Sequence, residues 1–257
     1  MNFTEQELLT QVTLFIWPFV RISSLFIAIP VFSARSTPVK IRIIIAFLTT
    51  LIIMPFLPEL PPVEMMSYEG VIVTAQQMAI GISMALILQM VFAVMLVAGQ
   101  LVAYSMGLGF ASMVDPASGI QVPVVAQILI ISASLFFLSV NGHLLAIELL
   151  IDSFTTLPIA MVGLTKADLW AIILWSGEMF AGGMLLALPI VATVLFINIS
   201  FGVAARAAPQ LQIFGIGFPI TIMVGMVLIW ITIPHMVDIF ATLLADGFQF
   251  IKQILRV

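Results

Sequence analysis

The stretch from Gly70 to Val114 contains no Asp, Glu, Lys or Arg, and this uncharged run limits the fold more than any other feature of the chain. As one continuous helix it would be about 68 Å long at 1.5 Å per residue. A membrane hydrocarbon core is about 30 Å thick, so the run must bend back, break or extend beyond a bilayer. We expect it to be buried in lipid, in partner subunits, or in both.

The composition extends this expectation to the whole chain. Of its 257 residues, 63% are hydrophobic and only 8% are charged, whereas a soluble domain carries roughly 25% charged residues. This balance excludes a soluble enzyme, a nucleic-acid-binding protein and a disordered protein. The absence of Cys excludes a disulfide or a thiolate metal site. Because Glu5 and Glu7 stand where a signal peptide carries basic residues, we expect the first hydrophobic segment to be retained.

Polar and Pro-rich connections divide the chain into about six hydrophobic segments. None of them alternates apolar and polar residues with a period of two, so the chain is predicted to be all-α, with membrane-associated helical hairpins and kinked helices. Apolar residues at helical spacing in the tail indicate an amphipathic C-terminal helix. Basic residues such as Lys40 favour a cytoplasmic position for the first connection. The six segments are Leu8–Pro30, Ile43–Leu57, Gly70–Val114, Val124–Ile151, Leu169–Ala205 and Leu211–Met236.

The usual sequence signatures of catalytic and cofactor sites are missing. The chain has no Walker-type phosphate-binding loop and no HExxH zinc motif, and its two His residues are far apart. Glu148 and Asp152 form one carboxylate pair at i, i+4 beside a connection. A solvated helix end is the favoured interpretation of that pair, and a proton relay is the alternative. We therefore predict no catalytic residue, no cofactor and no metal site.

Two charged residues lie inside apolar segments, where burial of charge is costly and often functional. Arg21 can reach the membrane surface, pair with an acidic group or contact a partner subunit, and we favour a structural contact with a partner. Glu178 poses the same question, with Lys166 or a partner chain as its candidate counter-charge.

Two short polar blocks interrupt other apolar segments. Arg206 precedes a break containing Pro209 and Gln210, where its guanidinium can satisfy carbonyl groups that the proline leaves free. Asn141 and His143 interrupt the fourth segment. A proton relay is one interpretation of His143, but a hydrogen-bonded contact between helices is favoured. We predict structural or partner contacts for all five residues.

An apolar loop with two glycines follows the long uncharged run. The glycines disfavour a stable helix, and an Asp-Pro step begins a turn. Flexible Met side chains can fill an irregular space, so the loop suits a deformable plug that closes a pore to ions. The alternative is an ordinary re-entrant segment buried in protein. The candidate plug residues are Met106, Gly107, Leu108, Gly109, Phe110, Met113, Val114, Asp115 and Pro116.

Four blocks of residues resemble the FliR family, the flagellar type III export-gate proteins with homologues in virulence secretion systems. The resemblance extends over nearly the whole chain, and the fourth block is the most specific. The blocks are Arg21 through Pro30-Val31-Phe32 to Pro38; Gly107-Leu108-Gly109-Phe110 followed by Asp115-Pro116; Asn141-Gly142-His143 with Ser153; and Arg206-Ala207-Ala208-Pro209-Gln210 with Phe214 and Gly217-Phe218-Pro219.

This resemblance implies a structural pore subunit rather than an enzyme. One copy would assemble with FliP and FliQ homologues in the bacterial inner membrane, at the flagellar basal body, in contact with the lipid bilayer. FlhB and FlhA homologues would join the assembly, unfolded flagellar proteins would pass through it, and neither a cofactor nor nucleic acid is expected.

The resemblance also implies a division of the chain. Residues 1–165 would form a FliP-like part that includes a pore plug loop at residues 106–122. Residues 166–257 would form a FliQ-like helical hairpin and the amphipathic C-terminal helix. A stand-alone secondary transporter or proton channel is the alternative function, although we detect no inverted repeat. An intramembrane enzyme is a weaker third possibility.

Overall fold

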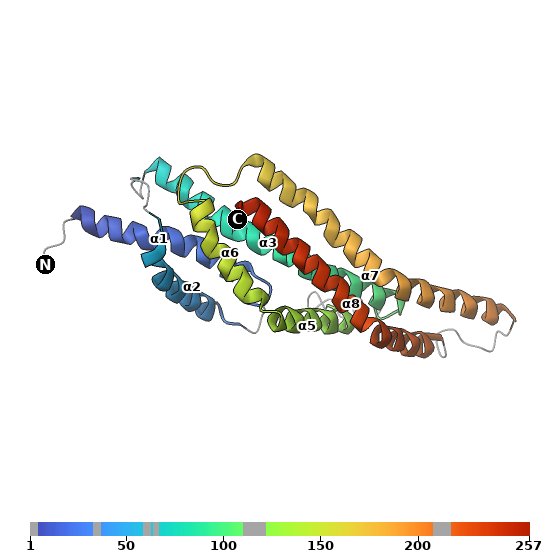
Figure 1. Ribbon diagram of the computed structural model, residues 1–257. Coiled ribbons are helices and arrows are strands. Elements are labelled where there is room, and N and C mark those ends of the chain that lie inside the picture. Colours follow the sequence, from blue (N-terminus) through green and yellow to red (C-terminus); the bar gives the residue numbers. More distant parts are fainter. Residues whose placement is uncertain (1–4, 33–36, 59–62, 64–66, 110–121, 208–216) are drawn as a thin grey trace. The chain divides into compact units, whose positions relative to one another are not determined.

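The chain folds into long α-helices, and the predicted all-α class is confirmed. The computed structural model describes residues 5–32, 37–58, 63, 67–109, 122–207 and 217–257, and this part of the chain contains no strand. Helices suit such apolar segments because each satisfies its own backbone hydrogen bonds where water is absent. The elements are α1 (Glu5–Ala28), α2 (Val39–Ile53), the 3-10 helix η1 (Met54–Phe56), α3 (Tyr68–Ser105), α5 (Val124–Ser139), α6 (Gly142–Thr156), α7 (Lys166–Ala207) and α8 (Phe218–Leu255) (Figure 1).

The helices correspond to the predicted hydrophobic segments. In the described residues, four helices are long and apolar enough to cross a membrane, namely α2 with η1, α3, α7 and α8. The α5–α6 pair passes the same test as a bent unit, and α1 contains a shorter apolar helix. The last apolar segment and the amphipathic tail form one continuous helix, α8. At 38 residues, α3 measures about 57 Å, which exceeds the thickness of a hydrocarbon core.

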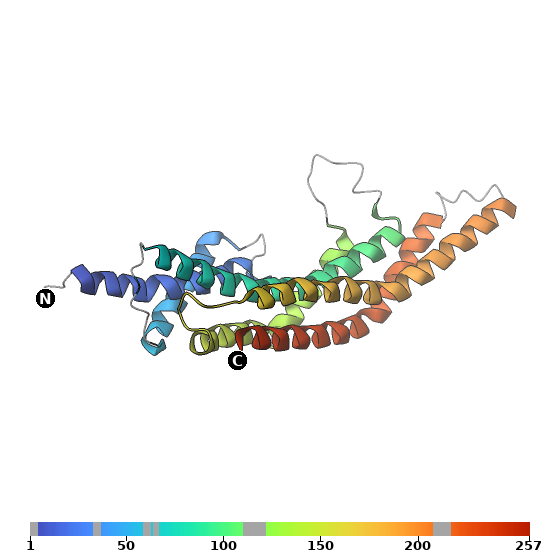
Figure 2. The ribbon, with the colours of Figure 1, turned by 90° about the horizontal axis from the view of Figure 1, so that it is seen from above.

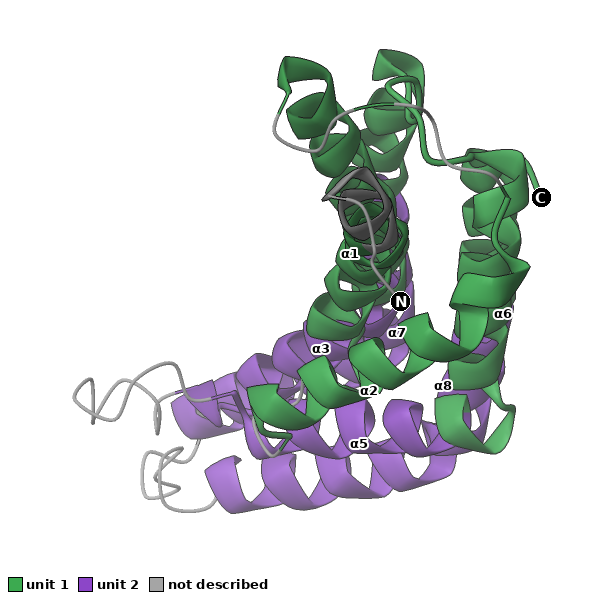
Figure 3. Ribbon diagram, turned by 90° about the vertical axis from the view of Figure 1, so that its left-hand side faces the viewer, with its two compact units in different colours: residues 1–90, 137–175, 244–257 green, residues 91–136, 176–243 purple. Residues whose placement is uncertain are grey.

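The chain forms two compact units, which Figure 3 colours separately. Unit 1 comprises residues 1–90, 137–175 and 244–257, and unit 2 comprises residues 91–136 and 176–243. Each unit thus combines stretches from different parts of the sequence. The predicted division into residues 1–165 and 166–257 stays a prediction, although α7 begins at Lys166.

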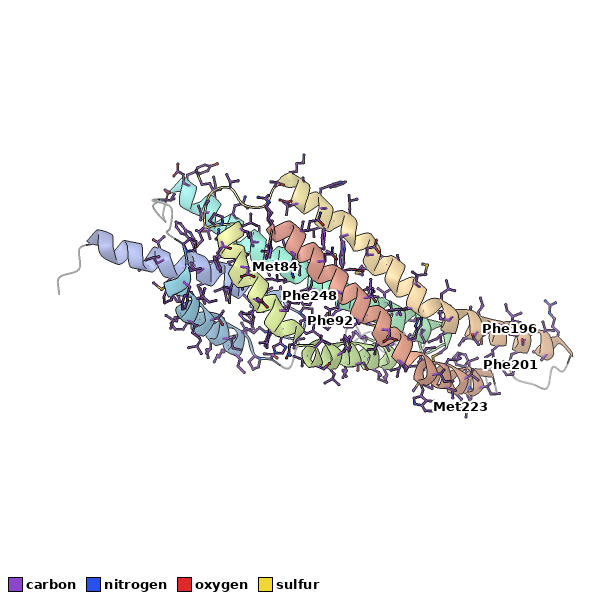
Figure 4. All side chains as sticks on the ribbon, in the orientation of Figure 1. Met84, Phe92, Phe196, Phe201, Met223 and Phe248 are labelled. Atoms are coloured by element: carbon purple, nitrogen blue, oxygen red, sulfur yellow. The ribbon has the colours of Figure 1, made fainter. Side chains whose placement is uncertain are left out.

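In unit 1, aromatic and aliphatic side chains pack between helices that are distant in sequence. Phe137 stacks on Phe248 with their ring centroids 6.3 Å apart, and Trp175 stacks on Phe250 at 5.6 Å. Phe248 and the buried Met84 are labelled in Figure 4. A Cβ added to Gly81 of α3 would clash with the backbone of α1, so the glycine permits the close approach of these two helices.

In unit 2, Phe240 of α8 packs against aromatic rings of α3 and α5. Its ring centroid lies 5.4 Å from that of Phe92 on α3 and 6.0 Å from that of Phe136 on α5. Gly99 of α3 leaves no room for a Cβ against the backbone of Ala126, so α3 and α5 approach closely near the ends that lead to the loop. The second half of α7 runs beside the first half of α8 in both Figure 1 and Figure 2.

The outer faces of the helices are apolar. On unit 2, Phe196 of α7 is 71% exposed and Met223 of α8 is 69% exposed (Figure 4). The α2 helix of unit 1 exposes eight large aliphatic or aromatic side chains. Exposed apolar patches of this size mark interaction with protein or membrane. These faces suit contact with lipid or with partner subunits, in agreement with the composition of the chain. The eight residues of α2 are Val39, Ile41, Ile43, Ile44, Phe47, Leu48, Leu51 and Ile52.

The start of α7 is fixed by a capping box. The Thr165 hydroxyl accepts a hydrogen bond from the backbone N–H of Asp168 at 3.2 Å, and the Asp168 carboxylate accepts one from the backbone N–H of Thr165 at 2.8 Å. Two backbone donors of the first turn are thereby satisfied. We expect Thr165→Ala to destabilise the chain by about 1 kcal/mol, measured by thermal unfolding in detergent.

The exposed Thr155 provides a matched control, because its hydroxyl donates only to the carbonyl of Asp152 within α6. Thr155→Ala should change stability by less than about 0.5 kcal/mol. Equal losses for the two variants would contradict the role of the capping box.

Candidate functional site

Arg21 of α1 is fully buried, and its guanidinium is held by the chain itself. Its Nε donates to Oε1 of Gln77 on α3 at 2.7 Å. One terminal nitrogen donates to the backbone carbonyl and the hydroxyl of Ser153 at 2.9 and 3.1 Å, and the other donates to the carbonyl of Leu157 at 2.8 Å. The guanidinium carbon lies 4.2 Å from the ring centroid of Phe154. Arg21 therefore joins three helices of unit 1.

The charge of Arg21 is stabilised by neutral groups. No carboxylate among the described residues forms an ion pair with it; both carbonyls that accept its bonds lie at the C-terminal end of α6. That end of a helix carries partial negative charge, which complements a cation. The side chain is 0% exposed. In the chain by itself the guanidinium is enclosed by these contacts, and the predicted contact of Arg21 with a partner subunit stays a prediction.

The Asn141–His143 block lies at the break between α5 and α6. Asn141 adopts the left-handed conformation with φ 57, and its carbonyl accepts bonds from the N–H groups of Leu144 and Leu145. It therefore starts α6 by its backbone. Nδ1 of His143 is buried and has no hydrogen-bond partner among the described residues. The predicted polar contact between helices is not formed by that atom in the described part of the chain.

Glu178 and Arg206 lie on exposed positions of α7 in unit 2. Neither forms an ion pair with another described residue. They remain candidate partner contacts. Pro209 and Gln210, the other predicted contacts in this block, lie outside the described residues.

The first plug residues form the ordered end of α3. Gly107 adopts φ 81, the left-handed region that favours glycine. Its N–H donates to the carbonyl of Tyr104 at 3.0 Å, and the N–H of Leu108 donates to the carbonyl of Ala103 at 3.0 Å. These two bonds define a Schellman motif, the common glycine-dependent end of a helix. Gly107 therefore caps α3.

The α3 end is packed against the start of α8 within unit 2. Met106 is only 1% exposed. A Cβ added to Gly225 of α8 would lie 2.6 Å from the sulfur of Met106, and one added to Gly107 would clash with the ring of Phe218. Each helix thus contributes a glycine that receives a large side chain of the other. This contact places small and large residues in complementary positions.

The α7 helix also contacts the end of α3. Nδ2 of Asn198 donates to the carbonyl of Ser105 at 3.4 Å, although Asn198 is exposed. Past the loop, Nε2 of Gln127 donates to the carbonyl of Val122 at 3.0 Å at the start of α5. The described residues thus include both ends of the loop. The predicted plug residues Phe110, Met113, Val114, Asp115 and Pro116 lie outside them.

Several residues of these clusters could not be singled out in the sequence. Gln77 and Asn198 are ordinary polar residues there, and Ser153 belongs to the third block without any sign of its partner; only the folded chain brings them to Arg21 or to the α3 end. Phe218 belongs to the fourth block that resembles the FliR family, but nothing in the sequence indicates its contact with Gly107 or that of Gly225 with Met106.

We expect Gly107→Ala to destabilise the chain by about 3 kcal/mol. A left-handed alanine costs roughly 1–2 kcal/mol, and overpacking against the Phe218 ring adds roughly 1–3 kcal/mol. Gly177→Ala is the matched control, because nothing lies within 4 Å of the added Cβ. In that helix position alanine should stabilise by about 0.5–1 kcal/mol. Thermal unfolding in detergent measures both changes, and similar effects of the two substitutions would refute the cap at Gly107.

Comparison with known proteins identifies the family of the chain. The sequence pattern of the Bacterial export proteins, family 1, matches residues 12–247. The flagellar biosynthetic protein FliR of Pectobacterium carotovorum subsp. carotovorum is 38% identical over 255 residues, covering 99% of this chain and 97% of that protein. FliR of Escherichia coli strain K12 is 36% identical over the same shares. FliR of Bacillus subtilis strain 168 is 29% identical over 218 residues, 84% of each protein.

The Pectobacterium and Escherichia coli relatives are similar over nearly their whole length, and the family pattern spans α1 to α8. The expected family resemblance is thereby confirmed. The chain belongs to the bacterial export proteins of family 1, the family of the flagellar biosynthetic proteins FliR.

Proposed function

We propose that the chain is a structural pore subunit of the flagellar type III protein export gate in the bacterial inner membrane. The observation that carries the proposal is the similarity to FliR proteins over 99% of the chain. In this role the chain assembles with FliP and FliQ homologues, and FlhB and FlhA homologues join the assembly. Unfolded flagellar proteins leave the cytoplasm through it. The chain acts by shape and packing rather than as an enzyme.

The exposed apolar faces support an assembly of this kind. On unit 2, side chains such as Phe196 and Trp230 protrude from α7 and α8. Neighbouring helical subunits and lipid can both cover such faces, whereas water cannot. We propose that residues 166–257 are the FliQ-like hairpin and residues 1–165 the FliP-like part. The exposed charges of Glu178 and Arg206 would then meet polar groups of neighbouring subunits.

The loop at residues 106–122 is proposed as the plug of the closed pore. Apolar side chains in a narrow passage exclude water, and ions cannot cross without it. The ordered cap at Gly107 supports this role because it gives the loop a defined starting point. A re-entrant segment with a purely structural role is the competing interpretation.

Co-purification tests the proposed function. The chain is tagged, extracted in a mild detergent and purified, and the mass and composition of the complex are measured. We expect one copy with several FliP and FliQ homologues. A monodisperse single chain that transports ions or small solutes would instead indicate a stand-alone transporter or channel and would refute the proposal.

A further inference from the structure

We propose that the last turn of α3, residues 102–108, is a fixed anchor that stays in contact with α8 while proteins are exported. Phe218 and Gly225 of α8 act as positioning residues for the loop that follows the anchor. This inference rests on the proposed function, because it assigns these residues a task in closing the export pore.

The backbone of the α3 end has few free groups. The carbonyls of Ala103 and Tyr104 accept the two bonds of the Schellman motif, and the carbonyl of Ser105 accepts the bond from Asn198. The carbonyl of Val102 accepts both the N–H of Met106 and the hydroxyl of Ser105. A helix end usually leaves four carbonyls without an intrahelical partner. Here the carbonyls of Ala103, Tyr104 and Ser105 each have a partner in unit 2, which makes unwinding of the turn costly.

The side chains restrict sliding and separation. The Met106 side chain fits against Gly225, and the Phe218 ring lies over Gly107, where a Cβ would clash. Thr221, one turn from each of these two α8 residues, is also buried. Separating α3 from α8 would expose Met106 and leave two glycine surfaces uncovered. Packed interfaces of this kind resist gradual deformation and remain in place unless another arrangement compensates for the lost contacts.

In this arrangement Gly107 has a different role from the flexible position that the loop sequence predicts. A glycine before an apolar loop indicates flexibility, but the φ of 81 and both hydrogen bonds place Gly107 inside a closed motif. The glycine is needed for the left-handed conformation and for the approach of Phe218. Gly107 is therefore part of the anchor and not a hinge.

A reversible cross-link tests whether the anchor stays closed. The chain contains no Cys, so the double variant Met106→Cys/Gly225→Cys introduces a single possible pair. A Cβ on Gly225 would lie 2.8 Å from Cγ of Met106, so the two Cβ atoms are at most one C–C bond further apart and do not exceed the upper end of the range that a disulfide accepts, about 3.5–4.5 Å. Export of a flagellar protein is measured after oxidation and again after reduction. The single variants Met106→Cys and Gly225→Cys receive the same treatment as controls.

We expect the oxidised double variant to export at the rate of its reduced form. A loss of export on oxidation that reduction restores, absent from both single variants, would show that α3 must leave α8 and would overturn the fixed anchor. Failure of the proposed function has a different signature, because wild-type chain would then purify without FliP and FliQ homologues.

Ion conductance of assembled complexes provides a second test that does not depend on the disulfide. Phe218→Ala removes the ring over Gly107 and should raise the ion conductance of the closed pore. Phe218→Leu keeps a large apolar side chain there and should leave this conductance close to that of the wild type. Assembly with partners is checked for both variants, since a structural defect alone would lower assembly without a leak. Equal conductance of Phe218→Ala and wild-type complexes would contradict the positioning role.

Discussion

Replacing Arg21 by methionine is expected to destabilise the chain by about 4 kcal/mol. The substitution keeps an unbranched side chain of similar length but leaves Oε1 of Gln77 and the carbonyl of Leu157 without the donor they have now. Each buried acceptor that loses its partner costs roughly 1–3 kcal/mol. Removal of the buried charge offsets part of this cost, since its desolvation is unfavourable in the wild type. The lost contacts outweigh that gain because the acceptors come from two different helices.

Thermal unfolding of the purified chain in detergent measures this effect. Arg21→Lys separates charge from geometry: lysine keeps the charge but lacks the planar fork that reaches several acceptors. We expect Arg21→Lys to be destabilised as well. Arg256→Met is the matched control, because Arg256 is 49% exposed and forms a surface ion pair with Asp168 at 3.3 Å. Such pairs contribute about 0–1 kcal/mol. If the loss of stability in Arg21→Met is also about 0–1 kcal/mol, the buried cluster around Arg21 does not hold the helices together.

Making the loop polar is expected to open the closed gate to ions. In the triple variant Phe110→Ser, Met113→Ser and Val114→Ser, the loop keeps its length and its anchor at Gly107. Each substitution replaces an apolar side chain by a polar one, and full burial of such an apolar side chain contributes about 1.5–3 kcal/mol. Water can then enter the passage, and ions follow it. Conductance of assembled complexes in planar bilayers, without an export substrate, measures the leak.

The single variant Phe110→Ala serves as the graded comparison for this leak. We expect it to conduct less than the triple variant, because in the proposed plug the neighbouring Met and Val side chains would still fill the passage. Unchanged conductance of the triple variant would count against the plug. A leak through Phe110→Ala as large as that of the triple variant would instead show that a single aromatic ring makes the seal.

Much of the fold follows from local sequence patterns. Apolar runs without alternation predict helices, and their breaks are marked by residues such as Pro30, Asn141 and Pro209. The α1 helix ends at Ala28 and α7 ends at Ala207, each two residues before a proline. Proline disfavours helical conformation in the residue before it and lacks a backbone donor. These signals act within a few residues, so the sequence alone reveals them.

The buried clusters depend on contacts that local patterns do not encode. Ser153 lies 132 residues from Arg21, and its hydroxyl shows no sign of this partner in the sequence. Pairing with an acidic group is the usual expectation for an arginine in an apolar segment, yet here a helix end and an amide supply the acceptors. Gly107 illustrates the same limit, because the flexibility of glycine and its use in a helix cap produce the same letter in the sequence. The φ of 81 and the two hydrogen bonds of the Schellman motif distinguish them in the folded chain.

Cross-linking to an exported protein tests the proposed pore most directly. A photoreactive phenylalanine analogue replaces Phe110 at the loop, and in a control chain it replaces Phe196, which is 71% exposed on α7. A flagellar export substrate fused to a tightly folded domain is arrested in the gate, and the complexes are irradiated. We expect a covalent product with the substrate from position 110, and products with neighbouring subunits or lipid from position 196. Assembled complexes that give no substrate product from position 110, or equal substrate products from both positions, would contradict the assignment of this chain to the wall and plug of the export pore.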